Sequence, residues 1–218
     1  MFDFNLDIKS YKHIHFIGIG GISMSGLAEI LLTKGYKVSG TDSKEGPIIA
    51  RLRKLGATVF LEHNKSNIQG ADLIIYTDAI STDNEELLAA KESQIETVDR
   101  ARFLGALMKN YTYSIAVSGT HGKTSTTSMI ASITNHGTLN PTVLLGGQLD
   151  DIGGNVKLGS TEYILTEACE YKANILKYFP TMAIILNIDE DHLDYFRDMN
   201  HIVDTFLGYA KNLEDKSY

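Results

Sequence analysis

Residues 119–124 read GTHGKT, a combination of glycine, lysine and threonine that suits the binding of phosphate groups. An apolar strand is expected just before it, at 114–117, and a helix just after, over 123–133. In that setting glycines let backbone amides converge on phosphate oxygens, and the helix adds its positive N-terminal end. Lys123 supplies a charge for the β- and γ-phosphates, and the Thr124 hydroxyl is a ligand for Mg²⁺. The predicted phosphate loop comprises Gly119, Thr120, His121, Gly122, Lys123, Thr124 and Ser125.

The match to the pattern G-x-x-x-x-G-K-[ST] is incomplete, because Val117 stands at the first glycine position. An ordinary left-handed turn between a strand and a helix is the alternative. A Gly-Lys-Thr sequence that opens a helix directly after a strand favours the phosphate loop.

Two acid-rich segments follow predicted strands at 163–166 and 183–187. The first reads EACE from Glu167, and the second reads NIDEDHLD from Asn187. Carboxyl ends of parallel strands reach one edge of a sheet, so both segments are expected beside the phosphate loop, where carboxylates can hold Mg²⁺. Four acids of these segments are expected to be solvated loop charges: Glu170, Asp189, Glu190 and Asp194.

A second glycine cluster, GIGGIS at 18–23, follows a predicted buried strand at 13–19. It begins like a dinucleotide-binding fingerprint, but Ser23 occupies the place of the third glycine. Asp42 lies about 20 residues on, where an acid that binds ribose would sit. Taken alone, this pattern leaves open both an NAD site and a tight turn in a structural α/β domain.

Longer stretches resemble the Mur ligase family. GTHGKTSTTSM at the phosphate loop is similar to Mur ligases and their folylpolyglutamate-synthetase relatives, and most of all to the branch that joins muramate to alanine. HFIGIGGISMSGLAEILLTKGYKVSGTD near the start resembles the same branch. The similarity continues through 70–72, 77–81 and 100–104, so it covers nearly the whole chain.

In that family the first domain binds the UDP part of UDP-N-acetylmuramic acid rather than NAD. The family usually has glycine where this chain has Ser23, so the local geometry of the turn is expected to differ. The resemblance implies substrate contacts from Gly18, Gly20, Gly21, Ser23, Met24, Ser25, Asp42, Ala79, Ser81 and Asn187.

The resemblance also implies a reaction in which ATP activates the substrate carboxylate as an acyl phosphate, which L-alanine then attacks. Lys123, Glu167 and His192 are the catalytic residues that it implies, with Mg²⁺ held by Thr124, Glu167 and His192. Family members carry a further C-terminal domain that closes over ATP. We therefore expect this chain to be the N-terminal part of such an enzyme and to be inactive by itself.

Three other functions stay open at this point. A Mpl-type murein-peptide recycling ligase of the same family attaches a tripeptide instead of alanine. An NAD-dependent oxidoreductase would use the first glycine turn and Asp42 but would have no use for the phosphate loop. A non-catalytic fragment that binds a UDP-sugar is the third.

The composition is that of an ordinary globular protein, with 43% hydrophobic and 22% charged residues. The net charge of -7 argues against general nucleic-acid binding. Cys169 is the single cysteine, so no intrachain disulfide can form. The sequence shows neither a signal peptide nor a long apolar stretch that would cross a membrane, so the cytoplasm is the expected compartment.

Short apolar strands alternate with amphipathic helices along the chain, which predicts an α/β fold with parallel sheets. Two strand–glycine–helix starts indicate two domains. We expect a Rossmann-like UDP-sugar-binding domain over 1–109, followed by a truncated P-loop α/β central domain over 110–218. Asp83 is expected to cap one helix. Helices are expected at 24–34, 47–55, 84–91, 100–109, 123–133, 173–178 and 202–212, and further strands at 37–40, 58–60, 73–76, 95–98 and 142–145.

Overall fold

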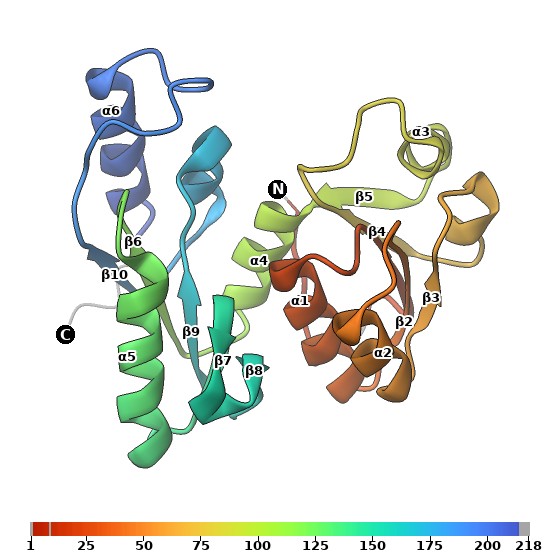
Figure 1. Ribbon diagram of the computed structural model, residues 1–218, viewed down its shortest axis with the longest axis horizontal. Coiled ribbons are helices and arrows are strands. Elements are labelled where there is room, and N and C mark those ends of the chain that lie inside the picture. Colours follow the sequence, from red (N-terminus) through yellow and green to blue (C-terminus); the bar gives the residue numbers. More distant parts are fainter. Residues whose placement is uncertain (1, 9, 214–218) are drawn as a thin grey trace. The chain divides into compact units, whose positions relative to one another are not determined.

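The computed structural model describes residues 2–8 and 10–213. The chain divides into two compact units, Met1–Phe103 and Leu104–Tyr218. Each unit contains a five-stranded sheet, and helices pack against the sheets (Figure 1). The predicted α/β class, with a parallel-sheet N-terminal domain and a second sheet domain, is confirmed.

The sheet of the first unit has the strand order β3-β2-β1-β4-β5, and all its pairs are parallel. All five residues of β1 are buried, as expected for the central strand of a covered sheet. The strand order changes direction between the neighbouring strands β1 and β4. Parallel α/β sheets bind ligands at the carboxyl ends of the strands at such a point. The elements are β1 His13–Ile17, α1 Ile22–Thr33, β2 Lys37–Thr41, α2 Pro47–Lys54, β3 Thr58–Phe60, η1 Lys65–Ile68, β4 Leu73–Tyr76, α3 Glu85–Glu92, β5 Glu96–Asp99 and α4 Arg100–Met108.

Three helix starts differ from the prediction. Helix α6 (Met199–Ala210) begins at Met199 rather than at residue 202, because the side chain of Asp198 caps it by accepting the His201 amide. Helix α1 begins at Ile22 rather than Met24, because extended Gly21 is its N-cap and the Ser25 amide donates to the Gly21 carbonyl. The predicted Asp83 cap of α3 is wrong. The side chain of Asn84 accepts the two free amides of the first turn, while Asp83 accepts the hydroxyl of Ser81 instead.

The sheet of the second unit has the order β10-β6-β9-β7-β8. Its pairs are parallel except that β8 runs antiparallel to β7. Strand β8 was not predicted, because the glycine-rich stretch from 146 to 159 shows no clear apolar alternation. The elements are β6 Tyr113–Ser118, α5 Lys123–His136, β7 Pro141–Leu149, η2 Asp150–Ile152, β8 Gly154–Lys157, β9 Ser160–Glu167, η3 Tyr171–Lys177, β10 Met182–Ile185 and α6 Met199–Ala210.

The helix predicted at 173–178 is a 3₁₀ segment, η3, rather than a regular α-helix. Lys172 and Ala173 have φ values of 53° and 54°, in the left-handed region, and this interrupts any regular right-handed helix. A core of aliphatic residues from α5 and the sheet, including Val117, Ala131 and Leu165, fixes the helix that follows the phosphate loop. Among the described residues no helix is long and apolar enough to cross a membrane.

Candidate active site

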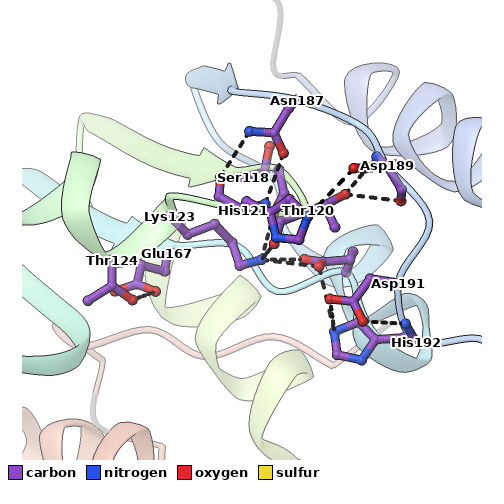
Figure 2. A network of polar contacts seen from close by, with 12 residues as sticks. Ser118, Thr120, His121, Lys123, Thr124, Glu167, Asn187, Asp189, Asp191 and His192 are labelled. Carbon is purple, nitrogen blue, oxygen red and sulfur yellow. Dashed lines mark hydrogen bonds and ion pairs between the residues drawn. The ribbon is translucent and has the colours of Figure 1, made fainter.

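The loop between β6 and α5 is the predicted phosphate loop, and polar contacts surround it (Figure 2). Gly119 and Gly122 have φ values of 130° and 83°, in the region that favours glycine. A Cβ on Gly119 would also lie 3.1 Å from the backbone nitrogen of Asn187. An open hollow of about 310 Å³ lies over the loop. It is lined by Thr120, His121, Gly122, Lys123, Thr124 and Ser125.

Asn187 holds the phosphate loop from the segment that follows β10. Its Oδ1 accepts the His121 amide at 2.9 Å, and its Nδ2 donates to the His121 carbonyl at 3.0 Å. Its carbonyl accepts the Thr120 amide at 3.2 Å. Both ends of the Asn187 side chain are therefore bonded to the loop backbone, so this residue shapes the loop.

The ammonium group of Lys123 uses all its hydrogen-bonding capacity within the site. It donates to the carbonyls of Gly119 at 2.6 Å and Thr120 at 3.1 Å. It also donates to both carboxylate oxygens of Glu170, at 3.0 and 3.1 Å. An ammonium group has three protons. Two of them point to the carbonyls, and the two Glu170 oxygens share the third.

The expectation that Glu170 is a solvated loop charge is wrong. Its side chain is 2% exposed, and its carboxylate is paired with Lys123. A carboxylate is rarely this buried without such a partner, because burial alone would disfavour its charge. The other three acids expected to be solvated, Asp189, Glu190 and Asp194, are exposed.

Thr124 and Glu167 form a second pair at the loop. The Thr124 hydroxyl donates to Glu167 Oε2 at 2.9 Å, and the Gly146 amide donates to Oε1 at 2.7 Å. A Cβ on Gly146 would lie 2.9 Å from Oε2, so a side chain there would displace the Glu167 carboxylate. Hydroxyl and carboxylate oxygens are the hard ligands that Mg²⁺ prefers, so this pair fits a magnesium ion shared with phosphate.

His192 lies at a different place in the site. Its Nε2 is 3.7 Å from Glu170 Oε1, and its ring centroid is 4.8 Å from that of Tyr171. Figure 2 shows His192 and Glu167 on opposite sides of Lys123. Within the part of the chain that the structure describes, no three His, Cys, Asp or Glu residues gather as a metal-binding group. The structure therefore brings Thr124 and Glu167 together and leaves His192 beside Glu170.

In the first unit, the glycine turn after β1 packs against the loop after β4. Gly18 has a φ of 83°, and a Cβ there would lie 2.6 Å from Thr77 Cγ2. Ala79 and Ser81, two of the predicted substrate contacts, belong to the same loop as Thr77. The Gly18 amide donates to the Thr41 carbonyl at the end of β2. These residues surround the point where the strand order changes direction.

Asp42 fixes the glycine turn. Its Oδ2 accepts the Gly20 amide at 2.8 Å, and its Oδ1 accepts the Lys44 amide at 3.1 Å. A Cβ on Gly20 would lie 2.7 Å from Oδ2. Asp42 thus holds the loop from the end of β2, and its carboxylate keeps lone pairs for a ligand hydroxyl.

The remaining predicted substrate contacts lie at the start of α1, which Gly21 caps. The Ser23 hydroxyl accepts from Arg100 Nη1 at 3.3 Å, and the Ser25 hydroxyl donates to the Ile22 carbonyl at 2.8 Å. Met24 is buried in the core. Any contact of Met24 with a ligand must therefore come from its backbone amide.

Comparison with known proteins identifies the arrangement. Residues 13–112 match the description "Mur ligase family, catalytic domain", and residues 117–218 match "Mur ligase middle domain". The chain belongs to the Mur ligase family. The two matches cover the first glycine turn and nearly all of the second unit, including the phosphate loop.

Several relatives of this Mur ligase chain are similar over its whole length. It is 55% identical to the UDP-N-acetylmuramate--L-alanine ligase of Clostridium beijerinckii over 99% of the chain, and 56% identical to that of Clostridium tetani over 100%. Each match covers 47% of the relative. The chain therefore spans about half the length of the curated relatives it matches.

Solved structures of Mur ligases have the same fold. UDP-N-acetylmuramate-alanine ligase MurC of Thermotoga maritima superposes with a TM-score of 0.85 and 34% identity, over 93% of this chain and 47% of that one. The UDP-N-acetylmuramate:L-alanyl-gamma-D-glutamyl-meso-diaminopimelate ligase of Neisseria meningitides gives a TM-score of 0.85 and 27% identity, over 95% of this chain and 70% of that one.

The Mur ligase chain also contains a buried polar cluster that its sequence did not reveal. Glu86 is fully buried and accepts from Thr41 Oγ1 at 2.5 Å and Asn67 Nδ2 at 2.7 Å. His63 Nδ1 lies 2.7 Å from Glu86 Oε2, and His15 Nε2 lies 3.8 Å from Glu86 Oε1. His15, a residue of β1, is therefore part of this cluster.

Burial governs the charge of His15. Desolvation lowers the pKa of its imidazole to about 4, although the neighbouring Glu86 carboxylate acts in the opposite direction. His15 is therefore neutral at pH 7. His13, the other histidine of β1, contacts the Gly70 carbonyl and shares the Ser39 hydroxyl with His15.

Proposed function

We propose that this chain is part of an enzyme that joins L-alanine to UDP-N-acetylmuramic acid with ATP, in peptidoglycan precursor synthesis. The observation that carries the proposal is a phosphate loop with Lys123 and the Thr124–Glu167 pair, in a chain 55% identical to L-alanine ligases. The proposed enzyme is expected to act in the cytoplasm, because its reaction depends on ATP.

The second unit binds the triphosphate in this proposal. The loop amides and the start of α5 face the phosphate oxygens, and the Lys123 ammonium donates hydrogen bonds to them. Thr124 and Glu167 hold Mg²⁺, which neutralises phosphate charge during transfer. Asn187 keeps the loop in shape through His121. These residues act by positioning and by charge neutralisation, as is general in phosphoryl transfer.

The reaction proceeds in two steps. A carboxylate oxygen of UDP-N-acetylmuramic acid attacks the γ-phosphorus, and the bond to ADP breaks with its electron pair on ADP. The alanine amine then attacks the acyl carbon, phosphate leaves, and the amine loses a proton as the amide forms. His192 is the third catalytic residue of the proposal, and its contact with Glu170 places it beside Lys123 rather than beside Glu167.

The first unit binds the uridine diphosphate group in this proposal. The turn at Gly18, Gly20 and Gly21 precedes the N-terminus of α1, where backbone amides and the helix dipole favour an anion. The loop of Ala79 and Ser81 lies beside that turn, as the contact of Gly18 with Thr77 requires. Asp42 holds the turn and has oxygen lone pairs for a hydroxyl group of the ligand.

The recycling ligase of the same family is the second candidate. A structure with that specificity superposes with a TM-score of 0.85. The alanine-adding ligase is favoured because identity to the Clostridium enzymes of that kind is 55–56%, against 27% to the recycling enzyme. Family membership also favours a ligase over an NAD-dependent oxidoreductase.

Calorimetric titration of the chain with ATP and Mg²⁺, UDP-N-acetylmuramic acid and NADH tests the proposal. We expect the first two to bind and NADH not to bind. Lys123→Ala should weaken ATP binding on the order of tenfold or more while leaving the uridine nucleotide unaffected. Binding of NADH without binding of the uridine nucleotide would contradict the proposal.

A further inference from the structure

Glu170 has no assigned part in the proposed chemistry, although it contacts two of its residues. Its carboxylate accepts a hydrogen bond from Lys123 and lies 3.7 Å from His192 Nε2. The side chain is 2% exposed. A buried anion therefore lies between the phosphate-binding lysine and the histidine of the site.

The backbone after Glu170 is held in an uncommon conformation. Lys172 and Ala173 both have left-handed φ values, which residues with a Cβ rarely adopt. The Ala173 amide donates to the Glu170 carbonyl at 2.9 Å, which closes this turn. Such strain persists only where surrounding contacts offset it, and here it accompanies the placement of a charged group.

A phosphate that binds to Lys123 must replace one of the present hydrogen-bond acceptors of the ammonium group. Two of these acceptors are the carbonyls of Gly119 and Thr120, which belong to the loop itself. Losing either contact would alter the loop that the phosphate needs. The Glu170 carboxylate comes from a separate segment after β9, so it is the partner that can leave without changing the loop.

We propose that Glu170 is an internal anion that occupies Lys123 until a nucleotide phosphate replaces it. Glu170 is thus a positioning residue: it keeps the lysine in the loop and competes with the phosphate for it. On release its carboxylate turns to His192, which lies on its other side. This inference rests on the proposed binding of ATP at the same loop.

The test compares ATP affinity of matched charge-removing variants by calorimetry with Mg²⁺ present. Glu170→Gln keeps the shape of the side chain but removes the competing charge, so ATP should bind about tenfold more tightly. Asp189→Asn removes an equal charge from an exposed side chain that lies 3.7 Å from His121 Nε2 rather than beside Lys123. It should change the affinity by less than about twofold.

A double-mutant cycle ties the effect to the lysine. In a Lys123→Met background, Glu170→Gln should change the ATP affinity by less than about twofold, because no ammonium remains to compete for. A structural role of Glu170 predicts weaker binding in the single variant, since a disturbed loop holds phosphate less well. A tighter affinity that disappears without Lys123 therefore supports exchange.

A measurement on the unmodified chain covers the case in which Glu170→Gln does not fold. The carboxyl carbon of Glu170, followed by NMR with labelled glutamate, should shift when ATP and Mg²⁺ saturate the site. An unchanged signal would contradict the replacement of Glu170 by phosphate at Lys123. Equal or weaker ATP binding by a folded Glu170→Gln would contradict it too, and neither result would contradict the proposed function. Failure of the unmodified chain to bind ATP would overturn the proposed function, and the exchange with it.

Discussion

Thr124 and Glu167 meet at 2.9 Å between the start of α5 and the end of β9. The two residues are 43 positions apart, and the pairing of β6 with β9 brings them to one edge of the sheet. Gly146, within β7, donates to the same carboxylate. Three neighbouring segments thus place a hydroxyl and a carboxylate beside the phosphate loop.

Replacing Glu167 by Gln should remove the charged ligand of this pair. We expect the gain in ATP affinity that Mg²⁺ provides to fall on the order of tenfold or more, because an amide binds this cation less well than a carboxylate. Titrations with and without Mg²⁺ measure the effect. Glu162→Gln, an exposed acid on the same strand, serves as the control, and an equal effect there would contradict the assignment.

The first glycine turn offers a test with adjacent residues. In Gly20→Ala the new Cβ would lie 2.7 Å from Asp42 Oδ2, so the turn must shift at a cost of roughly 1–3 kcal/mol, and binding of the uridine nucleotide should weaken. In Gly21→Ala the nearest atom is 3.6 Å away, and the cost should stay below about 1 kcal/mol.

Hydrogen exchange of the β1 and β2 amides gives the stability of the first unit in both glycine variants, and calorimetry gives the affinity. Similar losses in Gly20→Ala and Gly21→Ala would show that the close approach of Asp42 does not govern the turn.

The buried His15 should make the first unit less stable in acid. Its folded pKa is about 4, below the ordinary value of 6.5, so between these values the unfolded chain binds a proton that the folded chain does not. Stability is therefore lost as the pH falls, by about 2 kcal/mol between pH 7 and pH 5. Hydrogen exchange of β1 amides, corrected for the intrinsic rate, should show this loss.

The variant His15→Asn keeps a polar group near Ser39 but cannot titrate in this range. Its stability should change less between pH 7 and pH 5 than that of the unmodified chain, whatever its stability at pH 7. Equal pH dependence of the two proteins would mean that His15 is not the group responsible.

Glu86 should be essential for the packing of the first unit. Glu86→Gln replaces one acceptor oxygen by a donor and leaves buried partners such as Thr41 unsatisfied, which should cost about 1–3 kcal/mol. Glu85→Gln, in the same turn of α3 but exposed, should change stability by less than about 0.5 kcal/mol. Hydrogen-exchange protection of the α3 amides gives the loss of stability in each variant. Equal losses would contradict the role of Glu86 in the buried polar cluster.

Much of the fold follows from short stretches of the chain. The glycine positions in 119–124, the helix after them and the alternation of strands and helices are local properties, because they depend on φ values and apolar spacing within a few residues. For this reason the glycine turn, the helix after it and the α/β class could be predicted, while phosphate binding at the turn stays a prediction. Strand β8 could not, because its position depends on pairing with β7 across a glycine-rich turn.

By itself the sequence determined the glycine turn that is predicted to bind phosphate, while the tertiary structure decided which charges are buried and what they contact. Glu170 and Lys123 are 47 positions apart, and Glu86 and Thr41 are 45 apart. Burial of these carboxylates depends on packing between elements distant in the sequence. Spacing within either acid-rich segment cannot distinguish buried Glu170 from exposed Asp189, because both follow a strand of the same sheet.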